Sequence, residues 1–150
     1  MADQQLLALD QWLLYRLTSD AELSNLLGER WYADFAPDTE EEPDYPLGVF
    51  HIMTAKDNKG MGGVTCLTGV TLLAQVVGEG GGYGDLRPAE RRLQELLFVQ
   101  TAVNVSIDAD AYAILGCQRV APIQRAELTR EGVRYNYLGG LFLLHVAALP

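Results

Sequence analysis

The residues whose spacing comes nearest to a known binding motif are glycines. Residues 78–84 read GEGGGYG and lie between an expected strand and an expected helix, which is where phosphate-binding loops occur. A phosphate-binding loop ends in lysine and a hydroxyl residue, whereas here the helix opens at Asp85 and Glu79 lies beside the glycines. The hairpin order also lacks the parallel crossover of a dinucleotide-binding fold. We therefore expect a loop that orders on contact with a partner, or a plain flexible turn, rather than a nucleotide site.

Other residue types that could do chemistry are isolated along the chain. His51 and His145 each lie in an apolar, strand-like run without a second ligand at metal-binding spacing, which favours core or interface histidines. Asp108 and Asp110 could transfer protons, but they follow Ser106 in an apparent loop with no apolar pocket to shift a pKa. No serine has the surroundings of a nucleophile elbow. We expect no catalytic residue, no metal and no cofactor, and hence a protein that is not an enzyme.

Length and charge narrow the function classes. The chain has 150 residues, which fits one domain over residues 1–150, and it carries 20 acidic against 11 basic residues for a net charge of -9. Binding of DNA or RNA needs a basic surface, so DNA could pass near this protein without being held. Cys66 and Cys117 lie in apolar runs and are expected to be free thiols in a cytosolic protein. The start of the chain and its apolar runs predict neither a leader peptide nor a membrane span.

Hydrophobic periodicity predicts the elements that must position these residues. A leucine stripe at spacings of three and four predicts a helix that ends near Thr18, and Ser19 with Glu22 forms a capping-box pattern for a further short turn that ends at Gly28. Two hairpins follow, separated by a helix that begins at Asp85. Their strands are expected at residues 47–55, 64–77, 113–122 and 133–149. This order, α-β-β-α-β-β, predicts an α+β fold with a single, mostly antiparallel sheet of about four main strands and two principal helices on one face.

The last expected strand is apolar on both faces. Alternate residues point to opposite sides of a sheet, so one set faces each way: Leu141, Leu143 and Ala147 on one side, and Leu138, Phe142, Leu144 and Val146 on the other. Two helices can cover only one face of a small sheet. The other face is expected to meet a second sheet or neighbouring subunits, which indicates an assembly protein.

Several local features occur in an order that resembles a known family. They are the leucine-spaced first helix, the Ser19-Asp20 step, Leu23 with Leu26-Leu27, Arg30-Trp31-Tyr32 before an acidic loop, Tyr45-Pro46 at the start of a strand, the helix over residues 85–98, and a final hairpin turning at Glu131-Gly132 before Tyr135. Together they resemble the small tail-terminator, or tail-completion, proteins of long-tailed bacteriophages, the group that includes the minor tail protein U of lambdoid phages. The resemblance covers nearly the whole chain.

The resemblance implies a subunit of a ring, expected to be a hexamer, that caps the finished tail tube, ends tail polymerisation and offers the surface for head joining. Its partners would be other copies of the chain, the tail tube protein and a head connector or neck protein, in a virion tail or neck assembled in the host cytoplasm. No catalysis and no membrane are implied. The expected subunit or tube contacts are Glu79, Gly80, Gly81, Gly82, Tyr83, Leu138, Phe142 and Leu144, and the acids that could line the DNA channel or lie on the surface are Glu40, Glu41 and Glu42.

Three alternatives stay open at this point. A head-closure or neck adaptor of a phage connector is similar in size and also lacks an active site. A monomeric adaptor or binding module would form no ring at all. A small nucleotide-binding enzyme would use the glycine loop.

Overall fold

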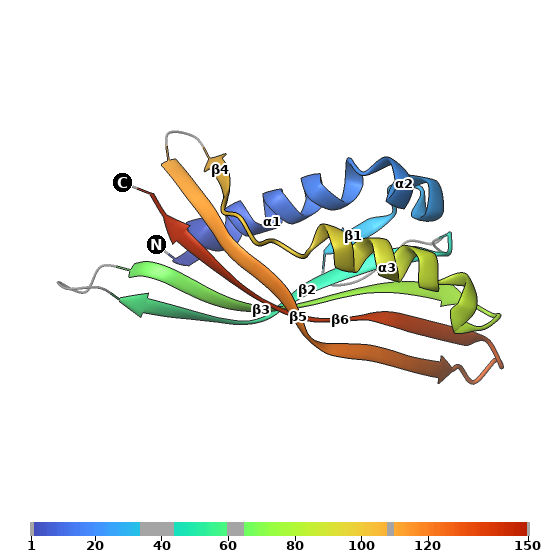
Figure 1. The fold of residues 1–150 in the computed structure, drawn as a ribbon. Helices are drawn as coiled ribbons and strands as arrows, with labels where there is room; N and C mark the ends of the chain where they lie inside the picture. Colours follow the sequence, from blue (N-terminus) through green and yellow to red (C-terminus); the bar gives the residue numbers. More distant parts are fainter. Residues whose placement is uncertain (1, 34–43, 60–64, 108–109, 150) are drawn as a thin grey trace.

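The computed structural model describes residues 2–33, 44–59, 65–107 and 110–149, and it shows one curled sheet with helices on one side (Figure 1). The elements are α1 (Ala2–Thr18), α2 (Ala21–Leu27), β1 (Trp31–Ala33), β2 (Leu47–Lys59), β3 (Thr65–Glu79), a 3-10 turn η2 (Tyr83–Asp85), α3 (Arg87–Leu96), β4 (Val103–Ile107), β5 (Asp110–Leu128) and β6 (Arg134–Ala148). The strand order is β1-β2-β3-β6-β5-β4, and among the described pairs only β1 with β2 is parallel.

The predicted sheet of about four strands with two principal helices is wrong. The residues that the structure describes are mostly sheet, with six strands that form a curled half-barrel and with three α-helices. The two added strands are short, since β1 has three residues and β4 has five, so neither carries enough alternation to be recognised. Both predicted hairpins are present. β2 runs four residues further than expected and β5 several residues further at each end, whereas β6 is one residue shorter than expected at each end.

The core lies between the sheet and α1, α2 and α3, which lie on the same side of the sheet (Figure 1). The leucine stripe predicted for the first helix is confirmed at Leu9, Leu13 and Leu17, which are fully buried, and α1 ends at Thr18. The expectation that Leu7 and Leu14 widen this stripe is wrong, since each is 47% exposed. On β6 the buried set is Leu138, Phe142, Leu144 and Val146. Burial of these aliphatic and aromatic side chains is the main favourable contribution to folding.

Two adjacent glycines allow the sheet to curl. Gly139 and Gly140 lie in the middle of β6, and a Cβ atom on Gly139 would stand 2.2 Å from the carbonyl oxygen of Ala74 on β3. On the other side of β6, the register of β5 shifts between Arg119 and Ala121, beside Gly140. Such a bulge bends a strand and increases its twist. The strand β6 is therefore tightly packed between β3 and β5 at the bend (Figure 1).

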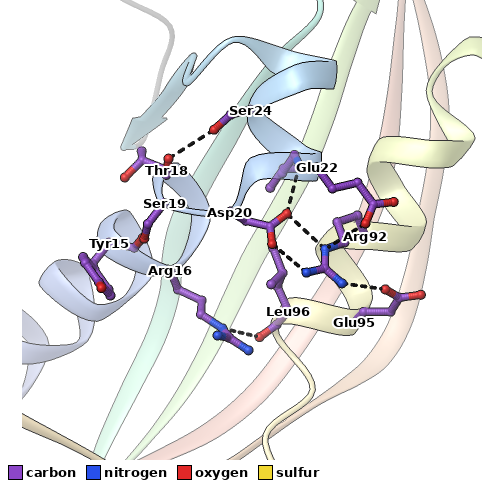
Figure 2. A network of polar contacts seen from close by, with 11 residues as sticks. Tyr15, Arg16, Thr18, Ser19, Asp20, Glu22, Ser24, Arg92, Glu95 and Leu96 are labelled. Atoms are coloured by element: carbon purple, nitrogen blue, oxygen red, sulfur yellow. Dashed lines mark hydrogen bonds and ion pairs between the residues drawn. The ribbon is translucent and has the colours of Figure 1, made fainter.

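An ion pair joins the α1-α2 corner to α3 (Figure 2). The N-cap of α2 is Asp20, one residue later than the predicted capping box, and its carboxylate accepts a hydrogen bond of 2.9 Å from the Leu23 N–H. The same carboxylate accepts hydrogen bonds of 2.6 and 3.0 Å from Arg92 of α3, which also donates to Glu95. A serine cap could not pair with the guanidinium in this way. Arg16 adds a further link, from its Nε to the carbonyl oxygen of Leu96 at 3.2 Å.

Replacing Gly139 by alanine should destabilise the protein strongly. The added methyl group meets backbone of β3, which cannot move aside as a flexible side chain would, so we expect a loss of about 1–3 kcal/mol in unfolding free energy. Gly82→Ala is the matched control, because Gly82 has a φ of -122° and no atom within 4 Å of an added Cβ. Urea unfolding followed by circular dichroism measures both. Equal midpoints for the two variants would contradict the role of Gly139.

The Asp20–Arg92 pair should make stability depend on pH. The hydrogen bond from Arg92 holds the pKa of Asp20 below its usual value, so the stabilisation is present above the unfolded pKa, near 4, and is lost as the pH falls through the folded pKa. We expect Asp20→Asn to keep the cap but lose the ion pair, and Asp20→Ala to lose both and cost more. Urea midpoints measured from pH 6 to pH 3 should fall less steeply for both variants than for the wild type. A parallel fall in all three proteins would refute this assignment.

Candidate assembly surface

In the described part of the chain, one face of the sheet carries no helix. The register of the four long strands places one set of side chains on this helix-free face: His51, Thr54 and Lys56 from β2, Gly69, Thr71 and Leu73 from β3, Leu141, Leu143 and His145 from β6, and Gln118 and Ala121 from β5. Leu143 is 37% exposed, and Leu73 and Leu141 are half-buried. The middle of this face is therefore apolar and only partly covered.

The chain covers one end of the helix-free face with tyrosines. A second hydrophobic cluster gathers Leu47, Val49 and Val77, with Tyr32, Tyr45 and Tyr137 packed against it. The guanidinium of Arg125 lies 4.0 Å from the centre of the Tyr137 ring, and the Tyr137 hydroxyl donates a 3.0 Å hydrogen bond to Glu127. Burial, together with Glu127, raises the pKa of Tyr137. This end of the face is closed within the subunit, whereas the region around Leu143 stays partly open.

The structure places the candidate contact residues of β6 on the covered face. Leu138, Phe142 and Leu144 are buried beneath the helices of their own subunit and form no surface for a partner. The large aliphatic side chains of β6 that reach the surface belong to the alternate set, Leu141 and Leu143. The apolar surface that the middle of this strand offers therefore lies on the helix-free face. Glu40, Glu41 and Glu42 lie outside the described residues.

Gly80 and Gly81 of the glycine loop are hydrogen-bonded to β6. Gly80 donates its backbone N–H to the carbonyl oxygen of Arg134 at 2.7 Å, and both Gly80 and Gly81 have positive φ angles near 60°. Their carbonyl oxygens accept hydrogen bonds of 2.9 and 3.3 Å from the side chain of Asn136, which is fully buried. Arg134 in turn donates to the Asn136 amide oxygen at 2.9 Å.

Of the loop's candidate contacts, Glu79, Gly80, Gly81 and Gly82 are exposed and Tyr83 is half-buried. Sequence reasoning missed Asn136, although a single amide within an apolar strand is a signal that a buried polar partner exists. The start of the loop, at Gly80 and Gly81, is thus held next to β6 by hydrogen bonds within the subunit.

The sheet leaves two long strand edges without a described partner strand. β1 pairs with β2 only along residues 48–50, and β4 pairs with β5 only along residues 110–114, with one further bridge at Cys117. Within the described part of the chain, no strand flanks residues 52–59 of β2 or residues 118–128 of β5 on the outer side. These two segments are called the β2 edge and the β5 edge below.

Large apolar side chains are exposed on both edges. Met53 on the β2 edge is 51% exposed, and on the β5 edge Val120 is 53% and Leu128 is 72% exposed. Unpaired edges with apolar side chains are sites at which another chain can add. The helix-free face and the two edges together form the candidate assembly surface.

The potential metal ligands, the free thiol and the groove of the described part of the chain do not lie together in one site. No group of three potential metal ligands is found among the described residues. Cys117 is buried, and its burial raises the pKa of the thiol to about 12, so it is protonated at neutral pH. A groove of about 530 Å³ between α1 and β4 is lined mainly by apolar side chains, including Trp12, Tyr15 and Val103. Its cation, Arg16, donates to the backbone of α3.

No helix in the described residues has the length and apolarity needed to cross a membrane.

Comparisons with known proteins give a fold but no family. No protein-family model matches the chain, and no curated protein sequence matches it. Among solved structures, a chain from the virion of a native gene transfer agent particle has a similar fold, with a TM-score of 0.57 and 16% identity. The likeness covers 89% of this chain and 91% of that chain. At this identity the comparison shows a shared fold over nearly the full length of both chains.

Removing the Asn136 side chain should loosen the glycine loop. Asn136→Ala leaves two carbonyl oxygens without their donor, and we expect a loss of about 1–3 kcal/mol in unfolding free energy together with faster hydrogen exchange at residues 80–83. The control is Asn104→Ala, which removes an exposed amide on β4. Hydrogen exchange measured by mass spectrometry reports on the loop directly. Unchanged exchange there would mean that Asn136 does not order it.

Proposed function

We propose that this protein is a structural component of a phage-like virion, and within that class a tail terminator. In this role several copies close into a ring on the end of the tail tube, stop its growth and present the surface for head joining. The observation that carries the proposal is the fold shared over nine-tenths of its length with a chain of a gene transfer agent virion. The finer role is supported by the resemblance of the sequence to tail-terminator proteins.

The surface of the subunit supports assembly. An apolar sheet face that is partly open, and two strand edges that expose Met53, Val120 and Leu128, are features that further copies would cover. A ring uses two different surfaces of each copy, and the β2 and β5 edges lie on opposite sides of the sheet.

The charge of the chain fits a part past which DNA moves. With a net charge of -9, the protein attracts no phosphate backbone, so DNA would slide past it without binding. The role that we propose is structural and includes no catalytic step and no cofactor.

Deletion of the gene distinguishes a tail terminator from a head-closure or neck adaptor, because loss of each kind of protein predicts a different particle. Deleting the gene from the phage or phage-like element that carries it should give tubes of uncontrolled, excessive length that bear no heads, because nothing then stops tube polymerisation. Electron microscopy of the lysate measures tube length, and supplying the gene in trans should restore uniform tails. Detached tails of normal length would instead assign the protein to the neck, and normal particles would overturn the proposal as a whole.

A further inference from the structure

We infer that neighbouring copies join through strand pairing, with the β2 edge of one copy adding to the β5 edge of the next copy. This inference rests on the proposed ring and names the interface that closes it. The partner is a second copy of the chain.

Both edges offer unpaired backbone groups over a long stretch. The β5 edge covers eleven residues and the β2 edge eight, whereas edge strands that must stay unpaired are usually short or hidden. Lys56, Lys59 and Pro122 on these edges would discourage indiscriminate pairing. They do not cover the exposed apolar side chains of Met53, Val120 and Leu128, which a partner strand would shield from water.

The strand directions are compatible with this pairing. β2, β3, β6 and β5 are each antiparallel to their neighbour, so β2 and β5 run in opposite directions. A β2 edge placed beside a β5 edge in the same orientation of the subunit would therefore be antiparallel as well. The alternation of the sheet would continue from one copy to the next, with the helices of every copy on the same side.

The two edges are offset along the sheet in a way that suits a closed assembly. Ile123 lies in the middle of the β5 edge, and the strand register across β6 and β3 (Gly139 and Gln75) aligns it with Val49 of β2. The middle of the β2 edge is Ala55, which lies six residues further along β2 than Val49. Each added copy would thus shift by about 20 Å along the strands for about 19 Å across four strands. The strands would then be tilted by about 45°, close to the tilt of about 35–45° in closed barrels.

Pairing of unlike edges also explains why assembly could continue past a dimer. Two β5 edges related by a twofold axis would pair with each other and leave only β2 edges free, so that no further copy could add at a β5 edge of that dimer. Pairing of a β5 edge with a β2 edge leaves one edge of each kind free at the ends of a growing arc, until the arc closes.

Cysteine cross-linking tests the interface in the full-length chain. The background carries Cys66→Ala and Cys117→Ala, and Lys56→Cys and Arg125→Cys place exposed thiols on the β2 and β5 edges of separate chains. With a short bis-maleimide, we expect cross-linked dimers from an equimolar mixture of the two chains and from neither chain alone. A chain with both cysteines should give a ladder that stops at the mass of the closed ring. The control chains carry Leu7→Cys and Leu14→Cys on α1 and should give no such ladder.

The outcomes separate this inference from the proposed function. Dimers from a single-cysteine chain alone would show pairing of like edges and overturn the inference. Rings that are visible by native mass spectrometry but give no cross-link between the two edges would overturn it as well, while leaving the ring standing. A chain that forms no oligomer on its own or on tail tubes would overturn the inference together with the proposed ring.

Discussion

Among the residues that the structure describes, helices cover only one face of the sheet, and the other properties of the surface follow from this imbalance. The three helices bury one alternate set of side chains on the long strands, including Phe142 and Leu144. On the opposite face the chain closes one end with tyrosines but leaves Leu143 and its neighbours partly open to water. Exposed apolar surface of this kind is unfavourable in a lone protein and is the usual mark of a contact region.

The bend in the sheet and the β2 and β5 edges are the further features that bear on assembly. Gly139 and Gly140 allow β6 to pass closely between β3 and β5, and the bulge at Arg119 bends β5 beside them. The short strands β1 and β4 each pair with only part of a long neighbour, which leaves one edge at each side of the sheet. The sheet thus combines a bend at Gly139 and Gly140 with the β2 and β5 edges, which are offset along the strands. Two unlike, offset edges suit a contact that repeats from copy to copy better than a contact with twofold symmetry.

The sequence predicted those parts of the fold that depend on local periodicity. The leucine stripe of α1, both hairpins and the two-faced character of β6 could be inferred because each repeats within a few residues. The strands β1 and β4 were missed because their pairing depends on distant residues and their own patterns are too short. The predicted contact residues of β6, Leu138, Phe142 and Leu144, are buried in the structure, because periodicity separates the two faces of a strand but does not tell which one the helices cover. The role of Asn136 could not be predicted, because its hydrogen bonds reach a loop more than fifty residues away in the chain.

The oligomeric state of the purified chain tests the central claim most directly. Native mass spectrometry over a range of concentrations, with negative-stain images of the same samples, would show whether other copies cover the open face and the edges. We expect one discrete, closed oligomer of more than two copies that appears as a ring. A protein that remains monomeric at every concentration, with the helix-free face around Leu143 freely accessible to solvent, would contradict it.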